Sequence, residues 1–179
     1  MKQITFIAIA IFIATIMTAC GQTSRYVPEG WKKFETHEFS VLYPETFELT
    51  SGVMPGARFM LVAPRTSPDD ISRVNINLNI QDFRGVDASL IDFVEFNERQ
   101  ITQIATDVYF IESRIVTTEE FEYHLIVFTF RQGLFNIKMM QRFMLKNEIA
   151  YTLTYTAMEE QFDNYIEIAT KIMDSFKIK

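Results

Sequence analysis

Two segments of the chain alternate apolar and polar side chains at every second residue. Between positions 74 and 82, Val74, Ile76, Leu78 and Ile80 alternate with three asparagines and a glutamine, and positions 149–156 repeat the pattern with isoleucine, tyrosine and leucine against alanine and threonine. Successive side chains of a β-strand point to opposite faces of a sheet, so this period predicts strands with one apolar and one polar face. A sheet is therefore the element around which the rest of the chain must fold.

Further strands are expected before and between these two segments. The predicted ranges are 31–35, 39–43, 58–63, 109–117, 121–131 and 135–146. Residues 125–130 (LIVFTF) are apolar at both parities, which predicts a central strand that is covered on both faces. Residues 131–134, with Gly133, and residues 146–148, with Asn147, are typical of tight turns, because Gly and Asn tolerate positive φ angles.

Two helices are expected in addition. The first begins at a capping residue, either Asp87 or Ser89, and its apolar residues recur at spacings of three and four as far as Val108. The second is predicted to begin at a capping box formed by Thr156 and Glu159 and to keep one apolar face throughout. We find no internal repeat and no second-domain boundary, so these elements are expected to form one α+β domain.

Charge and cysteine content exclude several classes of protein. The chain has 179 residues and a formal net charge of -6 at pH 7, and from position 20 onward it carries 16 basic and 23 acidic residues, a net charge of -7. Nucleic-acid binders show a basic stripe and a high pI, so no nucleic-acid partner is expected. A single cysteine excludes internal disulfide bonds and zinc sites built on several thiolates.

The first twenty residues have the layout of a secretory signal. Lys2 is followed by an apolar run over residues 4–17 and by small residues immediately before Cys20. The run is shorter than the roughly 20 apolar residues that span a bilayer. Residues 17–20 (MTAC) resemble the lipobox of bacterial lipoproteins, although that family most often has Leu where Met17 stands. The resemblance implies that residues 1–19 are removed as a signal peptide and that Cys20 is lipidated.

The lipobox resemblance also implies a location. Residues 20–30 form a short polar tether, about 17 Å long as a flexible coil, which precedes a body formed by residues 31–179. The membrane is then a partner through the lipid anchor, and the expected location is the periplasmic face of the inner or outer membrane of a bacterial cell envelope. Two alternatives stay open, namely a cleaved signal in which Cys20 is incidental and an uncleaved signal anchor.

Three short motifs carry a second resemblance. They are residues 39–44 (FSVLYP), 150–155 (AYTLTY) and 172–177 (IMDSFK), and the chain order is strands, helix, strands and terminal helix. This arrangement resembles the PsbP-like superfamily, which includes the DcrB-type periplasmic lipoproteins. The resemblance covers about residues 31–179 and implies a single α+β domain in which an antiparallel β-sheet is flanked by helices, an α/β/α sandwich. It implies no shared enzymatic activity.

Residues suited to catalysis or metal binding are scarce. The chain has two histidines, one thiol and no Gly-x-Ser-x-Gly motif. His124 is expected to be a hydrogen-bonded structural residue of a strand, and His37 a solvated residue of a turn. The acidic pairs lack the spacing of metal ligands, and Met139, Met140 and Met144 are expected to fill the core rather than bind copper. No enzyme activity, cofactor or metal ion is therefore expected.

Two polar surfaces are candidate binding sites. One is an amide ladder on a single strand face, which could hold sugar hydroxyls or a peptide backbone and consists of Asn75, Asn77, Asn79 and Gln81. The other is a cationic line of one parity, which could meet anionic headgroups or an acidic partner and consists of Lys138, Arg142 and Lys146. An ordinary hydrophilic sheet face is the alternative for both.

Taken together, these features predict a membrane-anchored envelope lipoprotein that acts as a non-catalytic protein-binding or assembly module, with an envelope protein as its partner. The alternative is a carrier or sensor of a small hydrophobic ligand or lipid. Such a ligand would lie in a cleft between the sheet and the C-terminal helix, lined by Met158 and Phe162.

Overall fold

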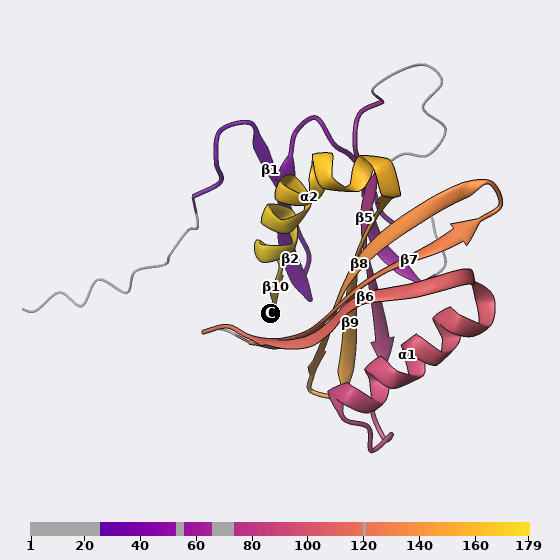
Figure 1. The fold of residues 1–179 in the computed structure, drawn as a ribbon. Helices are drawn as coiled ribbons and strands as arrows, with labels where there is room; N and C mark the ends of the chain where they lie inside the picture. The colour runs from indigo at the N-terminus through magenta and orange to yellow at the C-terminus, as the bar shows by residue number, and fades with distance from the viewer. Residues whose placement is uncertain (1–25, 53–55, 66–73, 120) are drawn as a thin grey trace, which may run out of the picture.

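The computed structural model describes residues 26–52, 56–65, 74–119 and 121–179 (Figure 1). The predicted signal peptide, the lipidation site Cys20 and the tether as far as residue 25 lie outside the described residues. Within the described ranges, no helix combines the length and the apolar character that a membrane crossing requires.

The described strands form two antiparallel sheets. The larger sheet has the order β3-β4-β5-β9-β8-β7-β6, with β3 at Glu48–Thr50, β4 at Ala57–Val62, β5 at Asn75–Asp82, β6 at Thr106–Thr117, β7 at Glu122–Gln132, β8 at Phe135–Lys146 and β9 at Ile149–Met158. The smaller sheet has the order β1-β2-β10, with β1 at Trp31–Glu35, β2 at Phe39–Pro44 and β10 at Lys177–Ile178. The short strands β3 and β10 and the division into two sheets were not predicted.

Two helices cover opposite faces of the larger sheet (Figure 1). Helix α1, Leu90–Ile104, packs on it through Phe93, whose ring centroid lies 5.1 Å from that of Phe83 and 5.6 Å from that of Phe143. Helix α2, Glu159–Asp174, lies with the smaller sheet on the other face, where the rings of Phe162 and Tyr155 are 4.6 Å apart. The predicted single α+β domain with an antiparallel sheet between helices is confirmed, and the smaller sheet is an addition beside α2.

The apolar segment 125–130 lies in β7 and is covered from both sides, as predicted. Leu125 and Val127 belong to the core under α2, whereas Ile126 and Phe128 belong to the core under α1. The strand is not central, however, since it is the neighbour of the edge strand β6. The middle position belongs to β9, which pairs with β5 over eight residues and with β8 over ten.

Both predicted tight turns are present in the larger sheet. Gly133 has a φ angle of 62° in the turn between β7 and β8. Between β8 and β9, Asn147 and Glu148 both have positive φ, at 52° and 59°. Two consecutive positive φ angles are typical of the two-residue hairpin turn whose twist matches that of the flanking strands.

Helix α1 begins at the second of its two predicted caps. The hydroxyl of Ser89 accepts the backbone N–H of Asp92, and the side chain of Asp92 accepts the backbone N–H of Ser89, so Ser89 rather than Asp87 is the cap. The helix ends at Ile104, because the following residue is extended and begins the path into β6. Val108, expected on the helix, therefore belongs to β6.

The capping box predicted for the second helix is wrong. Strand β9 continues to Met158, so Thr156 still lies in the sheet when the helix begins at Glu159. The N-cap residue is Met158, which makes no side-chain capping bond. Because strand β9 passes directly into the helix, the position before the first helical residue is occupied by Met158, and Thr156 lies too early in the chain to cap the helix.

Phe93 is expected to be the main anchor of α1. The Phe93→Ala substitution removes a side chain that is 2% exposed and leaves a cavity under the helix, so the free energy of unfolding should fall by about 3–5 kcal/mol. Phe96→Ala, on the same helix but 45% exposed, is the matched control and should cost less than about 1 kcal/mol. Denaturant unfolding measures both values, and equal losses would contradict the packing described above.

Candidate functional site

The predicted amide ladder lies on β5, on the α1 side of the larger sheet. Gln81 pairs with Ala150 of the core under α1, and the asparagines share its face. Asn79 donates its amide N–H to Oδ1 of Asn77 at 3.2 Å, and Asn77 donates to Asn75 at 3.5 Å. The three asparagines are half-buried, and only Gln81 is exposed. The ladder therefore uses part of its hydrogen-bonding capacity on itself.

A cavity of about 520 Å³ lies beside this ladder, between the end of α1 and the hairpin of β7 and β8. Gln141 connects the two regions, because its Nε2 donates to Oγ1 of Thr154, the β9 partner of Asn77, at 3.2 Å. Its Oε1 is buried and has no hydrogen-bond partner in the described structure. The walls around it are largely apolar, with Phe128 and Phe130 among them. The Gln141 amide alone, in a largely apolar cavity, does not indicate which ligand the cavity would bind.

The predicted cationic line is not an exposed row. Lys138, Arg142 and Lys146 share a face of β8 as predicted, but that face lies under α2. The Nζ of Lys138 lies 4.4 Å from the ring centroid of Phe162 and 3.6 Å from a carboxylate oxygen of Asp163, both on α2. Arg142 is 5% exposed, whereas Lys146 at the strand end is exposed. The expected surface is corrected accordingly: α2 covers two of its three members.

Two neighbours hold Arg142 in place. Its Nη1 donates to Oδ1 of Asp174 at 2.6 Å, and its guanidinium carbon lies 4.9 Å from the ring centroid of Tyr123. Its Nε is buried and has no hydrogen-bond partner in the described structure. Buried donors without a partner are rare in folded proteins, so Arg142 is an unusual residue of this sheet.

Arg142 and Lys146 border a groove at the C-terminal end of α2. The groove consists of two adjoining hollows of about 430 and 180 Å³. The larger hollow is lined by Thr118, Glu119, Phe121, Tyr123, Arg142, Asp174 and Lys177, and the smaller by Phe121, Met144, Lys146, Phe176, Lys177 and Ile178. Three separate parts of the chain thus meet here: the connection from β6 to β7 with the start of β7, the strand β8, and the end of α2 with β10. We call this site the Arg142 groove.

The composition of the Arg142 groove suits an anionic group attached to an apolar body. Among the described residues, three cationic side chains and two carboxylates stand in its walls. A guanidinium that is fixed by an aromatic ring and a carboxylate presents its remaining N–H groups in a set direction, which favours carboxylate and phosphate oxygens. Met144 and Phe176 supply an apolar floor next to it.

His124 takes part in a chain of hydrogen bonds that joins α1 to the sheet. Its Nε2 lies 2.8 Å from Oγ of Ser113 on β6, and Ser113 donates to a carboxylate oxygen of Glu98 on α1 at 3.1 Å. Burial lowers the pKa of His124, and the nearby Glu98 carboxylate opposes this effect. The ring is thus neutral near pH 7 and donates from Nε2 to the serine, because the serine proton goes to Glu98.

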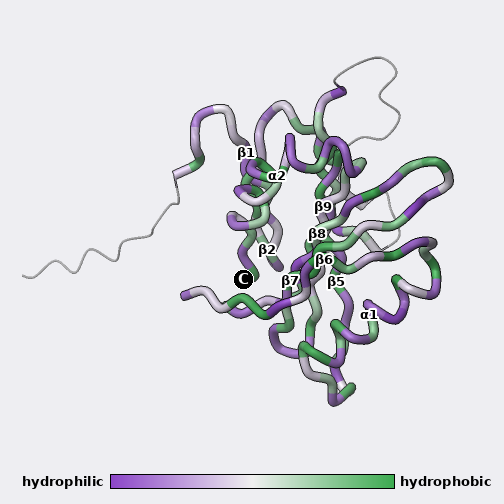
Figure 2. The backbone as a smooth tube through the Cα atoms, viewed as in Figure 1, coloured by the Kyte–Doolittle hydropathy of each residue, from purple (hydrophilic) through white to green (hydrophobic). Residues whose placement is uncertain are grey.

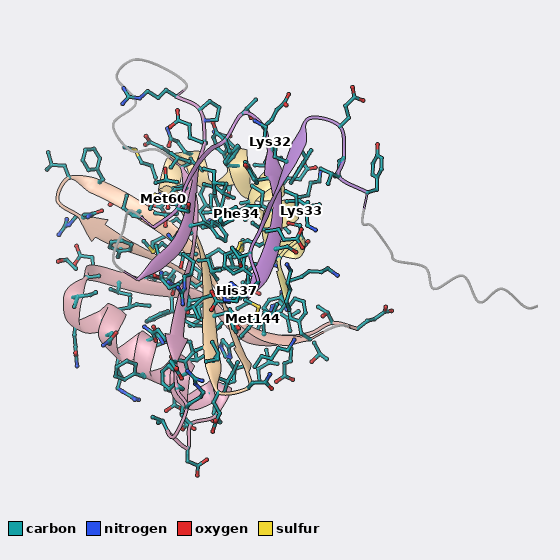
Figure 3. All side chains as sticks on the ribbon, turned by 180° about the vertical axis from the view of Figure 1, so that it is seen from behind. Lys32, Lys33, Phe34, His37, Met60 and Met144 are labelled. Atoms are coloured by element: carbon teal, nitrogen blue, oxygen red, sulfur yellow. The ribbon has the colours of Figure 1, made fainter. Side chains whose placement is uncertain are left out.

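These three residues are the types of a nucleophilic triad in a different order. In a triad the carboxylate orients the histidine, and the histidine takes the serine proton. Here the carboxylate binds the serine, and Nδ1 of His124 is buried without a partner in the described structure. The hydrogen-bonded structural role predicted for His124 agrees with this geometry. His37 is exposed at the turn between β1 and β2, as predicted (Figure 3).

Other predicted ligand sets are not brought together. Within the described ranges, no group of three or more His, Cys, Asp or Glu side chains is placed to hold a metal ion. Met140 and Met144 are buried in the core under α2, while Met139 packs against the core on the α1 side. The three methionines therefore pack in the two cores, as predicted, and Met139 lies on the opposite face of β8 from the other two.

The cleft expected between the sheet and α2 is filled by protein. Phe162 is buried against Tyr155, whose hydroxyl donates to the carbonyl oxygen of Phe162 at 2.7 Å. Met158 instead borders a shallow hollow on the outer side, next to Leu134 and Phe135 at the hairpin tip. The predicted lining of the ligand cleft is thus wrong, because a large aromatic side chain occupies that space.

No protein-family model matches this sequence, and no curated protein sequence matches it either. Its fold, however, is the PsbP-like α+β fold. Cyanobacterial PsbP (CyanoP) from Synechocystis sp. PCC 6803 is similar to it with a TM-score of 0.62 at 13% identity, over 91% of this chain and 99% of that one.

Two further solved structures show the same architecture. LpqN of Mycobacterium tuberculosis, which is involved in cell envelope biogenesis, has a TM-score of 0.62 at 11% identity, over 83% of this chain and 90% of that one. PA94 of Pseudomonas aeruginosa, a protein of unknown function, has a TM-score of 0.58 at 11% identity, over 81% and 94% of the two chains. At these identities the similarity concerns the fold alone.

The lowered pKa of His124 predicts a loss of stability in mild acid. The unfolded chain takes up a proton at this residue near pH 6.5, whereas the folded chain does so only at lower pH. The contribution of neutral His124 is therefore complete above pH 6.5 and is lost as the pH falls from 6.5 toward the folded pKa. Denaturant unfolding at about pH 7.5 and about pH 5.5 measures this loss.

The two histidines provide a matched pair of variants for this measurement. His124→Gln should abolish the part of the pH dependence that arises from the buried ring, and exposed His37→Gln should retain it. A pH dependence that is the same in both variants would show that the ring of His124 does not resist protonation.

Proposed function

We propose that this chain is a lipid-anchored, non-catalytic binding module of a bacterial cell envelope, and that the Arg142 groove receives an anionic group of an envelope protein. The observation that carries the proposal is the state of Arg142. It lines the larger hollow, is buried and oriented by Tyr123 and Asp174, and has no hydrogen-bond partner for its Nε in the described structure. A guanidinium that is fixed in this way offers N–H groups to a partner carboxylate in a set direction, which a flexible, water-exposed lysine does not do.

Electrostatics in the groove favour an anion over a neutral partner. Asp174 is more than half exposed, so its charge is screened by water, whereas the charge of Arg142 acts inside the protein. Lys146 extends the positive region to the outer rim. A carboxylate that reaches Arg142 would form charge-assisted hydrogen bonds worth about 1.5–3 kcal/mol each.

The location in the envelope is supported by the N-terminal residues and by one structural neighbour. Residues 17–20 have the lipobox pattern, and Cys20 is the single cysteine of the chain. LpqN, which has the same fold, is involved in cell envelope biogenesis. The short tether would keep the body, and with it the groove, close to the membrane surface.

A carrier of an anionic amphiphile is the second candidate function. The smaller hollow favours it, because Met144, Phe176 and Ile178 form an apolar floor directly beside the cationic residues. Its small volume accepts only a short apolar segment and not a whole acyl chain. Mass spectrometry of the purified, denatured protein would reveal a stoichiometric lipid or metabolite if this candidate is correct.

Site-specific photo-crosslinking in the native envelope tests the groove. A photoreactive amino acid in place of Lys146 stands at the rim, and the same amino acid in place of Arg84 stands at an exposed site in the connection from β5 to α1. We expect one discrete protein adduct at position 146 and none at position 84.

The Arg142→Lys substitution then separates groove binding from simple proximity. It keeps the charge but loses the planar contact with Tyr123 and the fixed donor directions, so the adduct at position 146 should decrease about tenfold. Thermal unfolding verifies that the variant is folded. Equal adducts at both positions, or a yield that is insensitive to Arg142→Lys in folded protein, would refute the proposed site.

The lipid anchor has a separate test. Cys20→Ser removes the thiol that acylation requires, so metabolic labelling with a palmitate analogue should disappear and the protein should leave the membrane fraction or stay unprocessed. Intact-mass measurement of the native protein gives an independent value. An unmodified Cys20, or equal labelling of the serine variant, would disprove the anchor without affecting the groove.

A further inference from the structure

The two edges of the larger sheet differ in length. Strand β3 ends the sheet on one side with three residues, and β6 ends it on the other with twelve. Folded proteins shield long edges with lysine, proline, bulges or a covering element, because an open edge offers unpaired N–H and C=O groups to another strand. Strand β6 contains neither lysine nor proline, and in the described structure only β7 pairs with it. Its two irregularities lie before Glu112, and the rest of the strand is regular.

Three of the exposed side chains of β6 are large and apolar. Tyr109, Ile111 and Ile115 are 68%, 50% and 53% exposed, with the exposed Ser113 between the two isoleucines. Ile111 lies in a bulge, since its neighbours Phe110 and Glu112 pair with consecutive residues of β7. Figure 2 shows both hydrophobic and hydrophilic stretches along β6. Exposed apolar side chains along an unpaired edge mark a place for association.

The sequence of β6 is complementary to itself in the antiparallel direction. If Ser113 is taken as a centre, Glu112 on one side corresponds to Arg114 on the other, and Ile111 corresponds to Ile115. A two-fold axis through such a centre places each residue opposite its counterpart in the second copy. Glu112 of one copy would then lie opposite Arg114 of the other, and Ile111 of one copy would lie opposite Ile115 of the other.

The two faces of the strand keep these pairs apart. Glu112 pairs with Val127 and Arg114 with Leu125, both of which belong to the core under α2, so the two charged residues lie on that side of the sheet. Ile115 pairs with His124, the neighbour of Phe143 in the core under α1, and so lies on the α1 side, while Ile111 is the bulge residue before Glu112. The regular pairing of β6 with β7 runs without interruption from Glu112 to the end of β6, so the centre lies in an undistorted segment.

We infer that β6 is a self-association edge: two copies of this chain pair through β6, antiparallel and centred on Ser113, so that the two larger sheets become one. Each Glu112 then meets Arg114 of the second copy, in addition to the ion pair that these two side chains form within one strand. The isoleucine pairs cover each other on the α1 side. This edge is separate from the Arg142 groove, so the inference does not rest on the proposed function.

A second copy fits this edge better than an unrelated strand does. An arbitrary partner would need an acidic and a basic residue at two fixed positions and apolar residues at the next two, whereas a second β6 brings all four by symmetry. Directly opposed opposite charges and apolar pairs are the side-chain contacts that stabilise neighbouring antiparallel strands.

A cysteine at the centre tests the register in the full-length protein, extracted in mild detergent. In Ser113→Cys the two thiols face each other across the two-fold axis, at the short Cα separation that a disulfide needs. Mild oxidation should therefore convert most of the protein into a reducible dimer. Thr117→Cys, on the same strand but off the axis, is the matched control and should stay monomeric on non-reducing gels, as should the wild-type chain with Cys20 alone.

Charge reversal tests the same edge without a new bond. Glu112→Arg or Arg114→Glu alone opposes like charges across the axis and should weaken the dimer about tenfold in analytical ultracentrifugation. The double variant restores opposite charges and should recover the dimer. Circular dichroism verifies that each variant is folded. A folded wild type that stays monomeric at every concentration, equal crosslinking at positions 113 and 117, or no recovery in the double variant would overturn the inference.

Discussion

The antiparallel pairing of β9 on both of its edges is the constraint on which the rest of the fold depends. It pairs with β5, which precedes α1, and with β8, which lies at the end of the run β6-β7-β8. The chain must therefore leave β5, pass through α1 to the far edge of the sheet and return strand by strand. Helix α2 follows β9 without a linker and covers the face that α1 leaves free. The Arg142 groove forms where this second helix ends.

Strand positions were predictable from the sequence because a strand that is buried on one face alternates apolar and polar residues with a period of two. Strands β5 and β9, the hairpin turns and the helical stripe of α1 all follow from local pattern and turn chemistry. The short strands β3 and β10 carry too few residues to show any period, and only pairing with distant strands defines them. The prediction of a capping box for α2 was wrong for a related reason, because pairing with β8 holds Thr156 and the two residues after it in the sheet.

The candidate site shows what strand parity can and cannot reveal. Parity correctly put Lys138, Arg142 and Lys146 on one face, but it does not tell which element covers that face. In the structure α2 covers this face, and its Asp163 and Asp174 form ion pairs with Lys138 and Arg142. A search for acidic residues on the predicted helix at matching separations could have indicated the pairing. The Ser113 and His124 contact could likewise have been found from the hairpin register, because diagonal neighbours on one face lie within reach.

Strand β2 has partners from opposite ends of the chain. Its pairing with β1 is local, but its other edge is completed by β10, and its Leu42 exchanges hydrogen bonds with the Ser175 hydroxyl, 133 positions later in the chain. During synthesis, one flank of β2 thus stays bare until the final turns of α2 and β10 have been made. Contacts of such long sequence separation form late. A nascent polypeptide of this kind displays an open strand edge until β10 has been made, and such an edge exposes incomplete molecules to association with other strands.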